Sequence, residues 1–296
     1  TRSVTITQPT AITTSSINTN VTCFGGNNGA INLSVSGGRS PYTFAWSNGS
    51  TTEDISAISA GAYNVIVADS NGCTATRAVT ITQPTVVTAS VTPTDPSCAG
   101  GTNGAISLTA AGGTPTYTYS WSTGATTQNI SSLSGGSYTV TVRDASLCTA
   151  TASATLTSPS LLTVTATGTN VSCNGGTNGT ASTIVSGGTS PYTYNWGGGI
   201  TTSNRTGLAA GTYNVTVTDA RSCSATASII ITQPAALSLS ATTSNATCNG
   251  LANGNVDLTV SGGITPYTYN WGGGVTTVST SWELGLQSLV GILSPG

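Results

Sequence analysis

The chain has 296 residues and a formal net charge of −2, and its charged residues make up only 5% of the sequence, against about 25% in an ordinary soluble domain. It contains no His, and its six cations are all Arg, so the usual general base is missing and no basic patch exists for nucleic acid or an anionic membrane. No run of 18 apolar residues occurs, so membrane insertion is not expected.

The predicted elements of one unit, in chain order, are short strands separated by turns. Residues 11–22 are rich in Thr and Ile, and an Asn-Gly turn leads into the alternating segment 30–36. A Gly-Gly turn precedes the aromatic segment 42–46, and the alternating segment 63–67 is followed by a last strand within 73–83. Six or seven short strands without a helical period predict a small antiparallel β-sandwich.

This unit recurs with a period of 75 residues. Cysteines repeat at 23, 98, 173 and 248 and again at 73, 148 and 223, and a Trp, a Tyr and a Pro keep the same spacing. We therefore expect an all-β tandem array of small immunoglobulin-like sandwiches. The predicted boundaries are 1–9 (the last strand of a preceding repeat), 10–84, 85–159, 160–234, and a truncated fourth repeat at 235–296 that leaves the pattern from about 278.

The boundaries contain no flexible linker, because Pro84 joins one strand directly to the next segment and fixes the backbone there. We expect an elongated, semi-rigid rod. A six-strand meander would return both termini to the same end of a domain, so the rod requires a seventh strand or a zigzag of neighbouring domains.

The cysteines predict disulfides, because a 75-residue domain buries little surface and a bridge closing about 50 residues would contribute roughly 4 kcal/mol. The favoured pairing lies within each repeat, and the rival joins Cys73 to Cys98 across a boundary. Cys248 has its within-repeat partner at position 298, so we expect a segment of a longer array. Disulfides indicate an extracellular, oxidising compartment. The favoured pairs are Cys23–Cys73, Cys98–Cys148 and Cys173–Cys223.

Asp69, Asp144 and Asp219 recur four residues before the second cysteine and are weak calcium candidates. Calcium takes 6–8 oxygen ligands, whereas each repeat offers one recurrent carboxylate, and an Asx turn is the favoured interpretation. No other metal site and no cofactor is predicted.

The recurrent Trp and the aromatic residues beside it could form a platform for sugar stacking, but one aromatic strand per repeat is more typical of a core. The alternate positions Thr43, Ala45, Thr193 and Asn195 are then the outer surface. A Ser-His-Asp or Ser-Lys arrangement is impossible, so we predict that the chain is not an enzyme.

Four motifs together resemble the SprB repeat: Cys-x-Gly-Gly-x-Asn-Gly, then Ser-Gly-Gly-x-x-Pro-Tyr-Thr-Tyr-x-Trp, then Gly-x-Tyr-x-Val-x-Val-x-Asp-x-x-x-Cys, then Ile-Thr-Gln-Pro. The second copy departs at Ala111 and Pro115, and the fourth stops early. The resemblance implies a surface adhesin of gliding Bacteroidota, exported by the type IX system, and it implies no catalytic residues. In the third copy the matching positions are Cys173, Pro191, Trp196, Gly211, Tyr213, Asp219, Cys223 and Pro234.

The predicted function is a structural stalk or filament at the cell surface, in which closed domains hold an adhesive tip away from the cell and transmit force. The alternative is that the repeats themselves bind polysaccharide. The expected partners are neighbouring repeats or like subunits of a filament. The leading strand Thr1–Pro9 could be donated to another chain, although one strand would not repair a fourth repeat that also lacks its Tyr-containing strand.

Overall fold

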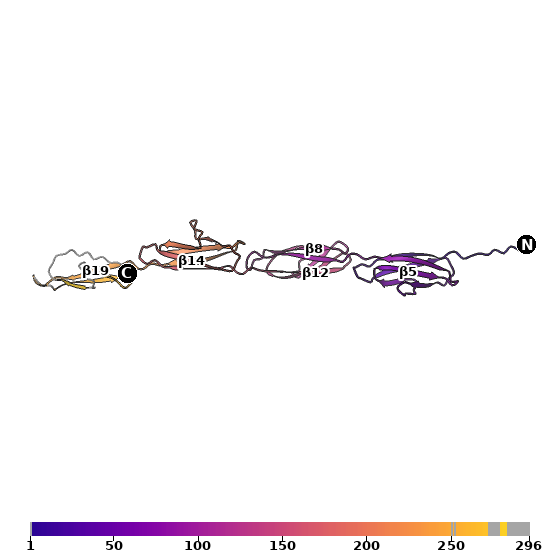
Figure 1. The fold of residues 1–296 in the computed structure, drawn as a ribbon, viewed down its shortest axis with the longest axis horizontal. Helices are drawn as coiled ribbons and strands as arrows, with labels where there is room; N and C mark the ends of the chain where they lie inside the picture. Colours follow the sequence, from indigo (N-terminus) through magenta and orange to yellow (C-terminus); the bar gives the residue numbers. More distant parts are fainter. Residues whose placement is uncertain (1, 250, 252, 272–278, 283–296) are drawn as a thin grey trace. The chain divides into compact units, whose positions relative to one another are not determined.

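The structure is a computed structural model that describes residues 2–249, 251, 253–271 and 279–282. These residues form β-strands, turns and irregular segments (Figure 1). No helix in the described part of the chain is long and apolar enough to cross a membrane. The first repeat contains β1 (Thr13–Thr19), β2 (Gly29–Ser36), β3 (Thr43–Trp46), β4 (Ile55–Ile58), β5 (Gly61–Ala68) and β6 (Thr74–Ile81).

The next two repeats have the same six strands at the corresponding positions. The second contains β7 (Thr88–Thr94), β8 (Gly104–Ala111), β9 (Thr118–Trp121), β10 (Ile130–Leu133), β11 (Gly136–Arg143) and β12 (Thr149–Leu156). The third contains β13 (Thr163–Thr169), β14 (Gly179–Ser186), β15 (Thr193–Asn195), β16 (Asn204–Leu208), β17 (Gly211–Thr218) and β18 (Ser224–Ile231).

Each complete repeat is a sandwich of two three-stranded antiparallel sheets. In the first repeat the strand orders are β1-β2-β4 and β3-β5-β6. Arg77 on β6 joins the two sheets at one edge, because its Nη1 donates to the Thr14 carbonyl at 2.9 Å and its Nε to the Ser16 hydroxyl at 3.1 Å. The tandem immunoglobulin-like β-sandwich fold expected from the sequence is confirmed.

The register shows why a repeat has its two ends on opposite sides. Thr43 of β3 pairs with Ala68 at one end of β5, while Ile58 of β4 pairs with Gly29 at the other end of the domain. The short strands β3 and β4 therefore run in the same direction, first along one sheet and then along the other. The chain therefore crosses the domain five times instead of six. Its two termini then lie at opposite ends of the repeat, as a rod requires, and no seventh strand is needed.

The core lies between the sheets and is built from the alternating positions. Ile31, Val65 and Val67 are fully enclosed, and the equivalent residues of the second repeat behave in the same way. The aromatic segment contributes its Trp to this core and its two preceding in-phase aromatics to the margin of the core. The alternation in the sequence thus corresponds to inward and outward side chains.

The described part of the fourth repeat contains one sheet, in the order β19-β20-β21. Its strands are β19 (Ser238–Ser244), β20 (Gly254–Ser261) and β21 (Ser279–Trp282). The remainder of the predicted off-pattern tail, 283–296, lies outside the described residues.

The chain divides into two compact units. The first holds Thr1–Pro96 and Gly100–Ser158, and the second holds Ser97–Ala99 with the chain from Pro159 onward. The short segment around Cys98 therefore belongs with the repeat that follows its own.

Candidate functional site: the disulfide-linked repeat junctions

Two disulfides join cysteines of successive repeats. Cys23 bonds to Cys148 and Cys98 bonds to Cys223, each with a Cα–Cα distance of 5.6 Å and a sequence separation of 125 residues. Each bridge connects the first cysteine of one repeat to the second cysteine of the next. Cys73, Cys173 and Cys248 are free and exposed.

The pairing expected within repeats is therefore wrong, and so is its rival between Cys73 and Cys98. Cys23 lies between β1 and β2 at the exit end, where Val21 N donates to Thr82 O at 3.0 Å. Cys73 lies between β5 and β6 at the entry end, where Ser70 N donates to Arg39 O. The five-pass topology places the two cysteines of one repeat at opposite ends, too far apart for a bridge.

The recurrent aspartate organises the turn that carries the second cysteine. Asp144 Oδ1 accepts from Ser146 N at 2.9 Å and from Cys148 N at 2.8 Å, and Oδ2 accepts from Thr114 N at 2.7 Å. Ala145 N in turn donates to Thr114 O at 2.9 Å. The carboxylate thus fixes the turn to the opposite sheet and holds Cys148 beside Cys23.

The same turn recurs in the other complete repeats. Asp69 accepts from Arg39, Asn71 and Cys73 backbone N–H groups, and Asp219 accepts from the equivalent three. All three aspartates are buried, with 3–6% of their surface exposed.

Hydrogen bonding lowers the pKa of each of these aspartates. For Asp144 the Thr114 N–H lowers the pKa most, opposed by desolvation, which raises it. For Asp69 and Asp219 desolvation by burial is the largest single influence and raises the pKa. The backbone donors, joined at Asp219 by the positive charge of Arg221, together outweigh it. The carboxylates therefore remain ionised and act as acceptors in the fold.

A glycine pair gives the carboxylate room to approach. Gly113 has φ +62°, and a Cβ atom there would lie 2.3 Å from Asp144 Oδ2 and 2.5 Å from Val87 Cγ2. The preceding Gly112 has φ +76°, and its Cβ would lie 1.9 Å from Val86 O. Only glycine fits this turn, which the sequence identified as a turn but not as the seat of the aspartate.

Gln83 has a junction role that the sequence analysis missed. Its side-chain Oε1 accepts from Gly25 N at 2.7 Å, and Gln233 accepts from Gly175 N at 2.8 Å in the third repeat. The glutamine of the Ile-Thr-Gln-Pro motif thus ties the first cysteine's loop to the exit strand. Its recurrence before the boundary proline was the available signal.

The SprB repeat model matches this chain four times, at residues 15–51, 90–126, 163–201 and 240–276, which together make up half of the sequence. The chain belongs to the SprB repeat family. Each match begins in the first strand of a repeat, and the first three matches end after the aromatic strand. No curated protein matches the chain.

Solved structures of immunoglobulin domains show a distant similarity to these SprB repeats. Sidekick-1 immunoglobulin domains 1–5 are 14% identical, with a TM-score of 0.35, over 77% of this chain and 60% of that chain. Titin domains I67–I69 are 11% identical, with a TM-score of 0.36, over 76% of this chain and 99% of that chain.

The recurrent aspartates of the SprB repeats do not lie in clusters of metal-binding side chains. Among the described residues no group of three or more His, Cys, Asp or Glu side chains could hold a metal ion. Each carboxylate already accepts three backbone N–H groups, which is the Asx-turn arrangement rather than a calcium cage.

The Trp of each SprB repeat belongs to the core. Trp46, Trp121, Trp196 and Trp271 have 3–8% of their surface exposed, and the indole N–H of Trp121 donates to Thr127 O at 2.9 Å. The interpretation of these rings as a sugar-stacking platform is wrong, because their faces are covered. The alternate positions Thr43 and Asn195 are exposed, as predicted.

Proposed function

We propose that this chain is a stalk segment of an extracellular surface adhesin, in which disulfides between successive repeats transmit force along the molecule. The observation that supports this proposal most strongly is that both bridges cross repeat boundaries. A disulfide inside a domain limits how far that domain extends when it unfolds. A disulfide between domains adds a second covalent connection between them.

The two bridges overlap along the sequence, since Cys98 lies between Cys23 and Cys148. Under tension at its two termini, the unfolded chain would become taut along the shortest covalent route. That route runs from the N-terminus to Cys23, across to Cys148, back to Cys98 and across to Cys223. It contains about 150 residues, so the chain could extend to about 500 Å instead of about 1000 Å at roughly 3.5 Å per residue.

Composition supports an extracellular, structural role. Disulfides persist in oxidising compartments, and a chain with only 5% charged residues offers few groups for nonspecific electrostatic contacts. The SprB repeats link the chain to the surface adhesins of gliding Bacteroidota, and export by the type IX system is part of this proposal.

Single-molecule force spectroscopy of the whole chain tests the stalk function. The oxidised chain should release about half the contour length of the reduced chain, because the bridges shield the backbone between Cys23 and Cys98 and between Cys148 and Cys223. The double variant Cys23→Ser and Cys98→Ser is the matched control, and it should behave like the reduced chain without any reductant. Equal extension of the oxidised and reduced chains would refute a role of the bridges in limiting extension.

A further inference from the structure

The first and the last strand of each complete repeat lie side by side. In the second repeat, β7 begins at the entry end, where Thr85 O accepts from Gly113 N at 2.9 Å, and it ends just before Asp95. β12 also begins at the entry end, directly after Cys148, and it ends just before Thr157. Asp95 Oδ1 accepts from Thr157 N at 2.7 Å at the exit end. Both strands therefore run in the same direction across the repeat, from its entry end to its exit end.

A recurrent hydrogen bond joins these two strands at the exit end, and we call it the exit clamp. In each complete repeat, a side-chain oxygen just after the first strand accepts from a backbone N–H just after the last strand, at 2.7–2.9 Å. The clamp thus holds the ends of the two strands together where the chain leaves the repeat. The acceptor and donor pairs are Asn20–Thr82, Asp95–Thr157 and Asn170–Thr232.

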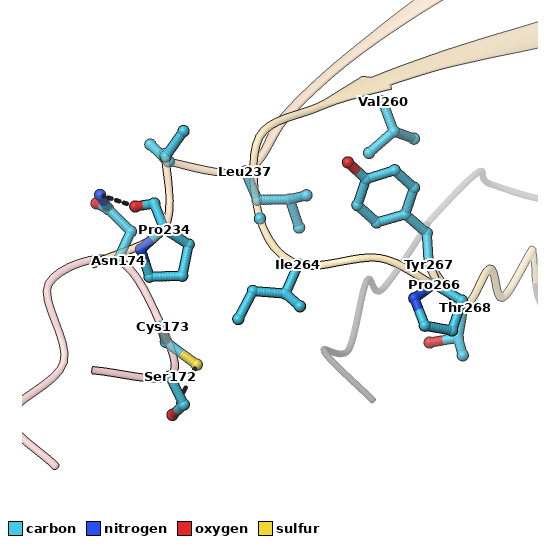
Figure 2. A pocket seen from close by; sticks show the side chains of 13 residues that line it. Ser172, Cys173, Asn174, Pro234, Leu237, Val260, Ile264, Pro266, Tyr267 and Thr268 are labelled. Carbon is cyan, nitrogen blue, oxygen red and sulfur yellow. Dashed lines mark hydrogen bonds between the residues drawn. The ribbon is translucent and has the colours of Figure 1, made fainter. Parts of the chain in front are cut away.

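Other hydrogen bonds reinforce the exit end of the third repeat. The Asn174 side-chain amide donates to Pro234 O at 3.0 Å, next to Cys173 (Figure 2). Val171 N also donates to Thr232 O at 3.0 Å. The loop that follows the first strand is therefore tied to the segment that follows the last strand at several points.

The disulfides connect these strands from one repeat to the next. β1 leads to Cys23, whose bridge to Cys148 leads into β12, and the backbone continues from β12 into β13. The backbone likewise continues from β6 into β7, and the bridge from Cys98 to Cys223 leads into β18. We call β1–β12–β13 and β6–β7–β18 the two covalent lines. Each complete repeat contributes one strand to each line, and each line follows its strands from entry to exit.

We infer that the two covalent lines carry the tension in this chain, and that the exit clamps stop one line from sliding past the other. This inference rests on the proposed stalk function. Tension applied to the two ends of this chain enters through β1, which belongs to the first line. It leaves through the segment after β18, which belongs to the second line. The force must therefore cross between the lines as shear between neighbouring strands.

The lines make the complete repeats resist this shear together. Neither line can lengthen much without breaking a covalent bond, because its strands are already extended. Sliding one line past the other therefore displaces the first and last strands of all the complete repeats at once. Without the bridges each repeat bears the load by itself, and the repeats give way one at a time. The other strands, such as β8 and β10, lie off both lines.

The test holds the oxidised whole chain at constant force and records its extension steps and lifetime. The complete repeats should give way in one step that frees about 50 residues, since the backbone from Cys98 to Cys148 is then the shortest connection between the lines. The double variant Cys23→Ser and Cys98→Ser should instead show a separate step of about 75 residues for each complete repeat. Asp95→Ala should shorten the lifetime of the oxidised chain at least about tenfold, because it removes one hydrogen bond to a charged acceptor.

Asn129→Ala is the matched control for the clamp. Asn129 Oδ1 accepts from Leu108 N at 2.9 Å on the side of the sheet away from β7, so this variant removes a similar hydrogen bond that lies off both lines. It should leave the lifetime under force unchanged, and urea unfolding checks that both alanine variants are folded. Asp95→Asn should keep more of the lifetime than Asp95→Ala, because Asn is the acceptor in the other two clamps.

Separate steps of the repeats in the oxidised chain would overturn the inference, and this result needs no clamp variant. Equal shortening of the lifetime by Asp95→Ala and Asn129→Ala would also overturn it, because the whole fold would then bear the load. An unchanged lifetime in Asp95→Ala would overturn it as well. These results leave the proposed stalk function standing, because that function depends on the total extension. Equal total extension of the oxidised and reduced chains would refute both.

Discussion

Replacing Cys148 by Ser, together with Cys23 to leave no new thiol, removes one bridge between repeats. When the first repeat unfolds beside a folded second repeat, the bridge closes a loop from Cys23 to the boundary at Pro84. A loop of about 60 residues costs the unfolded chain about 4 kcal/mol in conformational entropy on the loop-closure estimate. The second repeat, from the boundary to Cys148, forms a loop of similar length, so both repeats should lose about this much stability.

The assay is thermal and urea unfolding of the whole chain, in which a loss of about 4 kcal/mol corresponds to a lower midpoint by on the order of 20 °C for a domain of this size. Cys73→Ser is the matched control and should leave the unfolding unchanged, because Cys73 is free and exposed. A thiol titration of the unfolded, non-reduced chain should give three free thiols. One free thiol, or a destabilising effect of Cys73→Ser, would refute the pairing between repeats.

Two further substitutions and one change of pH test the turn and the core. Gly113→Ala should destabilise the second repeat by at least about 2 kcal/mol more than Gly124→Ala. Both glycines have positive φ, but only a Cβ atom at Gly113 would meet other atoms. Equal losses of stability in the two variants would contradict this packing argument. Trp121→Ala should cost about 3–5 kcal/mol in the free energy of unfolding, against little for the exposed Thr118→Ala, and a similar loss from both would contradict the core assignment. The pKa of the buried aspartates is lower in the folded chain, so the unfolded chain binds more protons in acid. The free energy of unfolding should therefore be constant above about pH 5 and fall below the ordinary carboxyl pKa of 3.8. Urea titrations from pH 2 to 7 measure this, and an unchanged free energy of unfolding in acid would contradict it.

The sequence was sufficient to predict the strands and the core. Alternation along 30–36 and 63–67 identified the inward residues, and the single Trp per repeat marked the centre of the core. These features are local, since a strand's two faces follow from its own residues. The turns were equally visible, because glycines mark them and adopt positive φ there, as at Gly37, Gly49 and Gly72.

The disulfide pairing could not be predicted in the same way, because it depends on the number of passes across the domain. The segments 43–46 and 55–58 read as two separate strands, and a meander of separate strands reverses at each one. The pairing of Thr43 with Ala68 and of Ile58 with Gly29 shows that both run in one direction. This one difference in direction moves Cys73 to the opposite end of the repeat from Cys23.

The topology makes the stability of one SprB repeat depend on its neighbours, and an excised repeat tests this dependence. A fragment of residues 85–159 carries Cys98 and Cys148, whose partners in the chain are Cys223 and Cys23. It should therefore contain two free thiols and be less stable than the same repeat in the whole chain by roughly 4 kcal/mol for each bridge lost. Urea unfolding followed through Trp121 measures this difference, and the reduced whole chain is the control, since it should approach the stability of the fragment. If the fragment instead forms a Cys98–Cys148 bridge and keeps the full stability, the two cysteines lie at one end of the domain and the five-pass topology is wrong.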